Sequence, residues 1–164
     1  MQSAINEQIN FEMFSANTYL SMSAYFAQQG LDGFAHWYYM QYKEELAHAE
    51  DMMHYVITRG GKVEIKAVAA VETEFNSPLE IAEKAYHHEC LVSEKIENLV
   101  RIASEEKDMP SQDFFWKYIR EQVEEEANAT NLIERVRIAK DAAILFLDKE
   151  LAARQQSLRP PNSA

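Results

Sequence analysis

The chain is poor in the residues that punctuate protein structure. Its 164 residues include only four glycines and four prolines, whereas an all-β fold needs turn residues about every ten positions. This scarcity argues against a β-sandwich or a β-barrel. The single cysteine, Cys90, excludes an internal disulfide framework and a metal site built from several thiolates, and it is typical of a reducing compartment.

Long apolar runs and excess positive charge are missing as well. No run of about 18 apolar residues is available to span a membrane, and the N-terminal sequence lacks the basic and apolar regions of a secretory signal. Sixteen basic and 27 acidic residues give a formal charge of −11, which repels nucleic-acid phosphates and attracts cations. We therefore expect a cytoplasmic protein with neither a membrane nor a nucleic-acid partner.

The apolar content is sufficient for one core. Apolar residues make up 47% of the chain, and the length suits a single domain over residues 1–164. Each long segment carries apolar residues at alternating spacings of three and four, the pattern of an amphipathic helix. The predicted helices span residues 3–29, 32–59, 77–105, 108–139 and, shorter, 141–156, followed by a tail over 158–164.

The order of these segments predicts an all-α four-helix bundle. Ser77 is placed as an N-cap, with Pro78 at the first helical position and Glu80 as its capping-box partner. The irregular segment 62–76 before it can extend to roughly 50 Å, longer than a helix of about 25 residues. We predict two antiparallel hairpins joined by this long crossover, with a short fifth helix at the C-terminal end.

Polar residues interrupt the apolar stripe near the middle of each long helix. They are Glu12, then Gln41, Glu45 and His48, then Glu89, and finally Gln122 and Glu125. In a bundle these positions meet at one depth. Buried carboxylates cost several kcal/mol each and repel one another, which a total stability of about 5–15 kcal/mol accommodates poorly. Bound cations relieve both costs.

The spacing favours a dinuclear carboxylate site. Glu45 and His48 lie one turn apart, and such sites in bundles combine Glu-x-x-His motifs with single glutamates from other helices. The ligands predicted for one metal ion are Glu12, Glu45 and His48. Those predicted for the second are Glu45, Glu89 and Glu125, so that Glu45 bridges the two ions. These ligand types suit iron, manganese or zinc, and the second ion, with oxygen ligands only, is expected to be held less tightly.

Each of these residues also has an ordinary structural interpretation. A single Glu in an apolar stripe is most often a register slip or a side chain that extends to solvent, and one Glu-x-x-His motif arises by chance in a Glu-rich chain. His87 and His88 illustrate this, since they adjoin Glu89 yet are expected to face solvent or a neighbouring subunit. The matching depth of the interruptions in four helices favours the metal site.

At these residues the chain resembles a non-haem ferritin of the prokaryotic type. The matching stretches are residues 10–15, 44–49, 88–89 and 121–126, and the similarity extends from about residue 3 to residue 155. The resemblance implies a ferritin-like fold, a homo-oligomeric shell of twenty-four subunits, and a ferroxidase centre within each subunit. At this centre dioxygen oxidises Fe(II), and the Fe(III) is stored as an oxyhydroxide mineral inside the shell.

The resemblance also assigns roles to individual residues. It places two iron ions at the ligands named above, with Gln122 on the dioxygen side. Tyr19 matches a tyrosine that hydrogen-bonds to the centre and donates an electron, although from the sequence alone it is a packed aromatic residue. A third, cavity-side iron site is implied at Glu44, Glu121, Glu124 and Glu125. Without the resemblance, the first three of these would be read as a solvated acidic face.

The chain departs from parts of the wider family. Leu46 follows Glu45 where bacterioferritins have a haem-binding methionine, so no haem is expected. The fourth helix offers Gln122 and Glu125 in place of a second Glu-x-x-His. Lys117 stands where family members commonly have a tryptophan, so the resemblance carries no redox role for that ring over to this chain. The absence of a Cys-x-x-Cys pair removes the rubredoxin module of rubrerythrins.

Three other functions would use parts of the same pattern. A di-iron or di-manganese oxidase of another substrate would share the ligands but would need a substrate pocket and no shell. A DNA-protecting mini-ferritin takes its metal ligands from two subunits, which the 141–156 segment and the motif at Glu45 and His48 oppose. A purely structural bundle with solvated acids would bind no stoichiometric metal.

Overall fold

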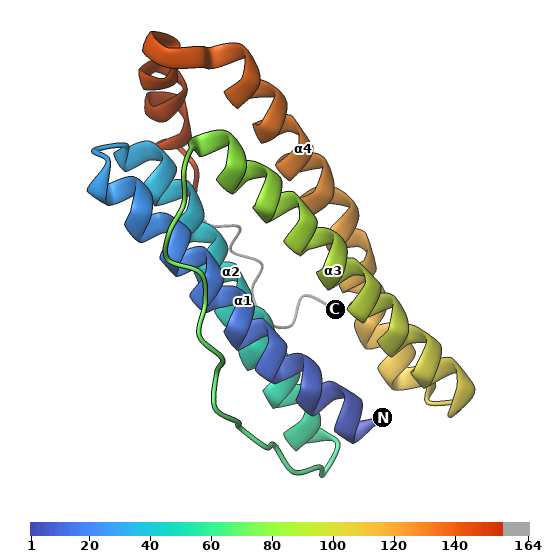
Figure 1. Ribbon diagram of the computed structural model, residues 1–164. Coiled ribbons are helices and arrows are strands. Elements are labelled where there is room, and N and C mark those ends of the chain that lie inside the picture. The colour runs from blue at the N-terminus through green and yellow to red at the C-terminus, as the bar shows by residue number, and fades with distance from the viewer. Residues whose placement is uncertain (156–164) are drawn as a thin grey trace.

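The computed structural model describes residues 1–155, apart from the side chains of residues 140–142. The described chain forms four helices: α1 (Gln2–Gln28), α2 (Asp32–Thr58), α3 (Pro78–Glu105) and α4 (Met109–Leu151). Helix α1 pairs with α2 and α3 pairs with α4, and the two antiparallel pairs lie side by side (Figure 1). The predicted all-α four-helix bundle is confirmed. Within residues 1–155 no helix is both long enough and apolar enough to cross a membrane.

Local sequence determines where α3 and α4 begin. The backbone N–H of Glu80 donates to Ser77 Oγ (3.1 Å), and Pro78 occupies the first turn of α3. The Glu80 carboxylate accepts from the backbone N–H of Asn76 (2.8 Å), one residue before the position used in a standard capping box. At the start of α4, Asp108 accepts from the backbone N–H of Ser111 (3.3 Å). Side-chain caps therefore start both helices of the second hairpin.

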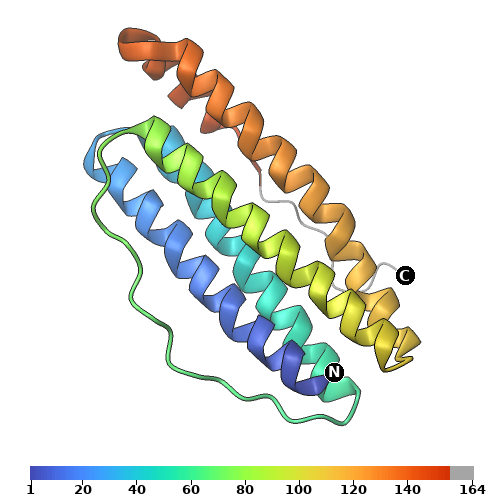
Figure 2. The ribbon, with the colours of Figure 1, turned by 45° about the vertical axis from the view of Figure 1, so that its right-hand side comes forward.

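The crossover between α2 and α3 runs along the outside of α1 from one end of the bundle to the other (Figure 2). The side chains of two asparagines of α1 form hydrogen bonds with backbone N–H and carbonyl groups of the crossover. Asn6 donates to the Lys62 carbonyl oxygen (2.9 Å) and accepts from the Glu64 N–H (2.8 Å). Asn10, one turn later, donates to the Glu64 carbonyl oxygen (2.8 Å) and accepts from the Lys66 N–H (2.6 Å). These bonds pair backbone groups of an otherwise irregular segment.

The predicted fifth helix is the continuation of α4. Helical structure runs from Met109 to Leu151, whereas the sequence predicted a break between residues 139 and 141. No glycine or proline lies in that stretch and alanine favours helix, so the ribbon bends sharply without ending and turns back toward the bundle (Figure 1). The last residue of the predicted fifth helix and the predicted tail over 158–164 lie outside the described residues.

The returning end of α4 rests on the start of α2. Gly33 permits a close approach, since a Cβ added there would lie 1.6 Å from the carbonyl oxygen of Asp148. The Asp148 side chain also accepts from the Phe34 N–H (2.9 Å). Leu147 and Leu151 are buried in the same apolar cluster as Phe34. Backbone contact, hydrogen bond and apolar burial together hold the end of α4 against α2.

The core divides into two apolar clusters. One is built around Tyr19, Phe26 and Phe34, and the other around Ile9 and Phe115. In every helix buried polar residues lie between the two clusters, and they include the carboxylates that interrupt the apolar stripes. These buried polar residues are Glu12, Gln41, Glu45, Glu89 and Gln122. The bundle therefore contains a polar layer between two apolar halves.

Candidate metal centre

Three side chains converge within the polar layer. Glu12 from α1 and Glu45 and His48 from α2 each offer one ligand atom, and these atoms lie within 4.8 Å of one another. The exposed fractions of Glu12 and Glu45 are only 1% and 3%. Glu45 and His48 share one face of α2 because they are three residues apart. The structure thus brings together the three ligands predicted for the first metal ion.

Burial raises the pKa of both carboxyl groups well above the ordinary range. For Glu12, desolvation is reinforced by repulsion from Glu45. For Glu45, desolvation is reinforced by repulsion from Glu89 and Glu125. A bound cation would reverse both effects, because it supplies positive charge where the folded chain has gathered negative charge.

Two carboxylate oxygens in this cluster lack hydrogen-bond donors. Gln8, one turn before Glu12, donates to Glu12 Oε1 (2.7 Å). Apart from the hydrogen bond that Glu12 and Glu45 share when one of them is protonated, Glu12 Oε2 and Glu45 Oε2 have no hydrogen-bond partner among the described residues. The two ring nitrogens of His48 lie 3.7 Å from Glu45 Oε2 and from Glu121 Oε2, too far for hydrogen bonds. Buried acceptors are nearly always paired in folded proteins, so these orphaned oxygens fit a metal ion.

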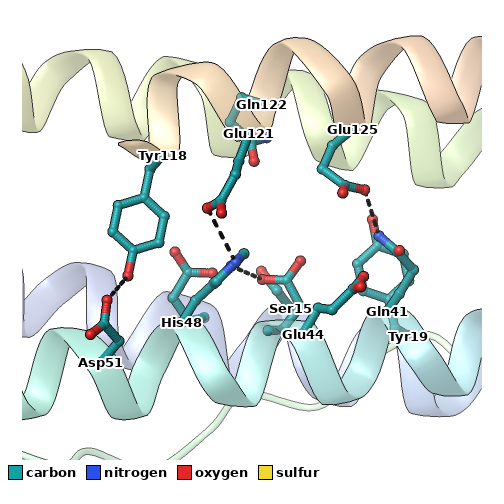
Figure 3. Close-up of polar contacts among 12 residues, drawn as sticks. Ser15, Tyr19, Gln41, Glu44, His48, Asp51, Tyr118, Glu121, Gln122 and Glu125 are labelled. Atoms are coloured by element: carbon teal, nitrogen blue, oxygen red, sulfur yellow. Dashed lines mark hydrogen bonds and ion pairs between the residues drawn. The ribbon is translucent and has the colours of Figure 1, made fainter. Parts of the chain in front are cut away.

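The ligands predicted for the second ion are engaged elsewhere. Within the described part of the chain, Glu89 and Glu125 are not in the close group of three. Glu89 accepts hydrogen bonds from the Tyr19 hydroxyl and from Gln122 Nε2 (3.1 Å). Glu125 accepts from Gln41 Nε2 (3.1 Å), and Figure 3 shows its carboxylate directed at that amide. The first ligand set is therefore assembled in this structure, and the second is not.

The pKa values of the second set are raised too. Burial raises the pKa of Glu89, although the hydrogen bonds from Tyr19 and Gln122 oppose the shift. Burial raises the pKa of Glu125 to about 7, with repulsion from Glu89 and Glu44 adding to it. Burial and the neighbouring Glu89 also raise the pKa of Tyr19 well above its usual value. Tyr19 therefore remains a neutral hydrogen-bond donor.

The three acids assigned to a third site lie in different surroundings. Glu44 accepts a hydrogen bond from Arg154 Nη2 (2.7 Å). Glu121 faces His48 across 3.7 Å, and Glu124 is exposed. Within residues 1–155 these acids do not form a close group like that at Glu12. A third cation site at these residues stays a prediction.

The side chain of Lys117 forms an ion pair. Its ammonium group pairs with Asp51, and the Tyr118 hydroxyl donates to the same carboxylate (2.6 Å; Figure 3). The Tyr118 ring meets the His48 ring edge-on, with centroids 5.2 Å apart. Lys117 and Tyr118 thus share Asp51, and Tyr118 packs directly against a predicted metal ligand.

The expectation for His88 was wrong. His88 Nε2 lies 2.8 Å from Ser15 Oγ, and its ring stacks on Phe11 with centroids 5.6 Å apart. Burial lowers the pKa of His88 to about 4, so the ring is neutral near pH 7. His88 lies at the edge of the buried face of α3, next to α1. The sequence of α3 alone did not reveal this contact. His87 is exposed, as expected.

Sequence reasoning missed two residues that contact the centre. Gln8 had a local signal, because it lies four residues before Glu12 on the same face of α1. Arg154 had none, because its contact with Glu44 spans 110 residues and depends on the return of α4 to the bundle.

A bundle of long helices around a buried carboxylate–imidazole cluster defines a class of metal-binding helical proteins. Residues 2–139 match the family model described as a ferritin-like domain. The chain belongs to the ferritin family.

Several relatives cover nearly the whole chain. A protein from Bacteroides fragilis (strain 638R) named "Bacterial non-heme ferritin" is 47% identical over 154 residues, which cover 94% of this chain and 97% of the relative. One of the same name from Staphylococcus haemolyticus is 39% identical over 153 residues, with 92% of each chain covered. The structure of an open pore ferritin from the archaeon Archaeoglobus fulgidus superposes with a TM-score of 0.93 at 46% identity, covering 94% of this chain and 97% of that one. The resemblance to prokaryotic non-haem ferritins is confirmed.

Proposed function

We propose that this protein is an iron-storage ferritin and a ferroxidase. It oxidises Fe(II) with dioxygen at the centre around Glu45 and keeps the Fe(III) as a mineral inside a shell of twenty-four copies. The observation that supports this most directly is the pair of orphaned, buried oxygens on Glu12 and Glu45 beside His48. Curated relatives named bacterial non-heme ferritin support the same assignment.

Iron is the substrate of this reaction. One Fe(II) is bound by Glu12, Glu45 and His48, and a second by Glu45, Glu89 and Glu125. Each Fe(II) loses one electron, and dioxygen takes up the two electrons together with two protons to reach the oxidation level of hydrogen peroxide. Anionic oxygen ligands favour Fe(III) over Fe(II), because the higher charge gains more from them. Oxidation at this site is therefore favourable.

The two ions are proposed to bind with unequal affinity. The first finds its ligands already gathered within 4.8 Å. The second must compete for Glu89 with the hydrogen bonds from Tyr19 and Gln122, and for Glu125 with the bond from Gln41. This competition reduces the net gain from binding the second ion. Tyr19 is also proposed as an electron donor to the oxidised centre, and Gln122 as a neighbour of the incoming dioxygen.

The substitution Glu45→Ala tests the centre, because it removes the ligand shared by both ions. Anaerobic Co(II) titration of the parent should reach two ions per subunit, and stopped-flow mixing with oxygenated Fe(II) should show a fast oxidation phase. In Glu45→Ala both the stoichiometry and the fast phase should collapse. Glu50→Ala removes an exposed carboxylate of the same helix and should change neither. Parent-like oxidation by Glu45→Ala would reject this centre.

Storage is tested separately. A sizing column should give an assembly near twenty-four times the 19.0 kDa of one chain, and iron added with oxygen should co-elute with it. Iron oxidation by a small assembly that retains no iron would instead indicate an oxidase without a storage role.

A further inference from the structure

Arg154 follows the end of α4 and reaches back to α2. Its guanidinium donates to Glu44 Oε2 (2.7 Å), to the Trp37 carbonyl oxygen (3.1 Å) and to Gln41 Oε1. It also lies over the Trp37 ring, with Cζ 4.4 Å from the ring centroid. His36 Nε2 lies 2.7 Å from the Arg154 carbonyl oxygen. The Arg154 side chain is only 18% exposed, so it is held in one place by several contacts.

Gln41 connects Arg154 to the metal centre. A guanidinium only donates hydrogen bonds, so the amide oxygen of Gln41 must face Arg154 and the amide nitrogen must face the other way. That nitrogen donates to Glu125 Oε2 (3.1 Å). Gln41 is 2% exposed, and its amide therefore has little alternative to these two partners. The orientation that Arg154 imposes on Gln41 determines which group Gln41 offers to Glu125.

The charge of Arg154 also acts on this region directly. It opposes the rise in the pKa of Glu125 that burial causes. Glu44, whose side chain is 13% exposed, contributes repulsion to both Glu125 and Glu45. Arg154 therefore offsets part of the negative charge at one side of the polar layer.

We propose that Arg154 is an internal counter-cation of the metal centre, which holds Glu44 directly and Glu125 through Gln41 until metal ions replace it. This inference rests on the proposed function. A cation at Glu125 or Glu44 competes with the hydrogen-bond donor for the carboxylate, so Arg154 lowers the affinity for the second ion and for any cation at Glu44. The first ion is affected less, because none of its ligands contacts Arg154 or Gln41 and only the charge of Glu44 acts on Glu45. Arg154 thereby increases the difference in affinity between the two ions.

Anaerobic Co(II) titration of the parent and of Arg154→Gln tests this proposal. The variant should bind the second Co(II) about five- to tenfold more tightly, the effect of removing one competing ion pair, and the first Co(II) with less than about a twofold change in affinity. The control variant Arg137→Gln also removes one positive charge, at a surface site of α4 where Arg137 pairs with Glu83 and Glu134. It should change neither affinity, which separates the local contact from overall charge.

Terbium luminescence measures cation binding at Glu44. Tb(III) bound at Glu44 would lie near Trp37, which Arg154 covers, so excitation of tryptophan should sensitise its emission. Arg154→Gln should shift the Tb(III) midpoint to about five- to tenfold lower concentration. In a Glu44→Gln background the same change should produce no shift, because the competed carboxylate is gone.

The outcomes separate the two proposals. A second Co(II) affinity that is unchanged or weaker in a folded Arg154→Gln variant overturns the role of Arg154 and leaves the proposed function intact. A parent that does not bind two Co(II) per subunit overturns the proposed function itself. If Arg154→Gln does not fold, Arg154→Lys is used to test the proposal. Lysine keeps the positive charge but lacks the planar guanidinium that hydrogen-bonds to Glu44 and Gln41 at the same time. At least twofold tighter second binding supports the proposal, and parent-like binding overturns it.

Discussion

Gly33 and Asp148 meet backbone to backbone at the point where α4 returns to α2. A Cβ built on Gly33 would lie 1.6 Å from the Asp148 carbonyl oxygen, so no larger residue fits unless the end of α4 moves away. Arg154, with its contacts to Glu44 and Gln41, lies just beyond this point. One glycine on α2 thus decides whether the end of the chain can approach the metal centre.

Gly33→Ala is expected to unseat the end of α4. The clash is with backbone rather than with a flexible side chain, and the burial of Leu147 and Leu151 depends on the same contact. We expect a loss of more than about 3 kcal/mol in the free energy of unfolding, measured by urea unfolding, and faster proteolysis near the C-terminal end. Gly30→Ala is the control, since nothing lies within 4 Å and only its φ of +72° opposes the change. It should cost about 1 kcal/mol, and equal losses in the two variants would contradict the steric explanation.

Asn6→Ala should loosen the crossover. The substitution removes the two hydrogen bonds from the Asn6 side chain to the Lys62 carbonyl and the Glu64 N–H, at a site where Asn6 is only 5% exposed. A loss of about 1–3 kcal/mol in unfolding free energy is expected, together with faster hydrogen exchange at Glu64. Asn128→Ala, at an exposed position of α4, should stay within about 0.5 kcal/mol of the parent. Equal losses in both variants would show that the crossover bonds contribute nothing.

Metal-free protein should lose a stability contribution from Glu125 as the pH rises. The pKa of Glu125 is about 7 in the folded chain against 4.5 as its ordinary value. Its contribution is therefore fully present below pH 4.5 and is lost as the pH rises toward and through 7. Glu125→Gln, which stays neutral, should gain up to about 3 kcal/mol relative to the parent between pH 4.5 and pH 8. Urea unfolding in a chelator measures this difference, and parallel pH profiles would refute it.

His88 should have the opposite pH dependence. Its pKa is about 4 in the folded chain against the ordinary 6.5, because burial disfavours the charged ring. The contribution is full above pH 6.5 and is lost as the pH falls toward 4. In His88→Gln, whose side chain does not titrate, the free energy of unfolding should fall by up to about 3 kcal/mol less than in the parent as the pH is lowered. The measurement is again urea unfolding, from pH 7 to pH 4, with His87→Gln at the exposed neighbouring position as the control. A His88 variant with the slope of the parent would show that the ring is not kept neutral.

Much of the architecture follows from short-range rules. The spacing of apolar residues predicts the long helices, and Ser77 and Pro78 mark the start of α3 because a helix cap involves only neighbouring residues. Glu45 and His48 share a face for the same local reason. The similar depth of Glu12 and Glu45 also follows from sequence, because both lie near the middle of antiparallel helices of equal length.

Other relationships required the tertiary structure. The sequence predicted Glu89 and Glu125 as metal ligands but did not reveal that Tyr19, Gln122 and Gln41 hold them in the metal-free chain. The bend in α4 was predicted as a break, because the change of direction depends on where Leu147 and Leu151 find an apolar surface.

Periodicity and capping act within one or two turns, so the long helices, their pairing and the meeting of carboxylates at one level could be predicted from the amino-acid sequence. The folded arrangement of the helices sets which of those carboxylates face one another and brings Arg154 to Glu44, 110 residues away in the chain. The reason is geometric. A contact between distant residues depends on helix rotation and on the direction of one bend, and neither is encoded in the spacing of neighbouring side chains.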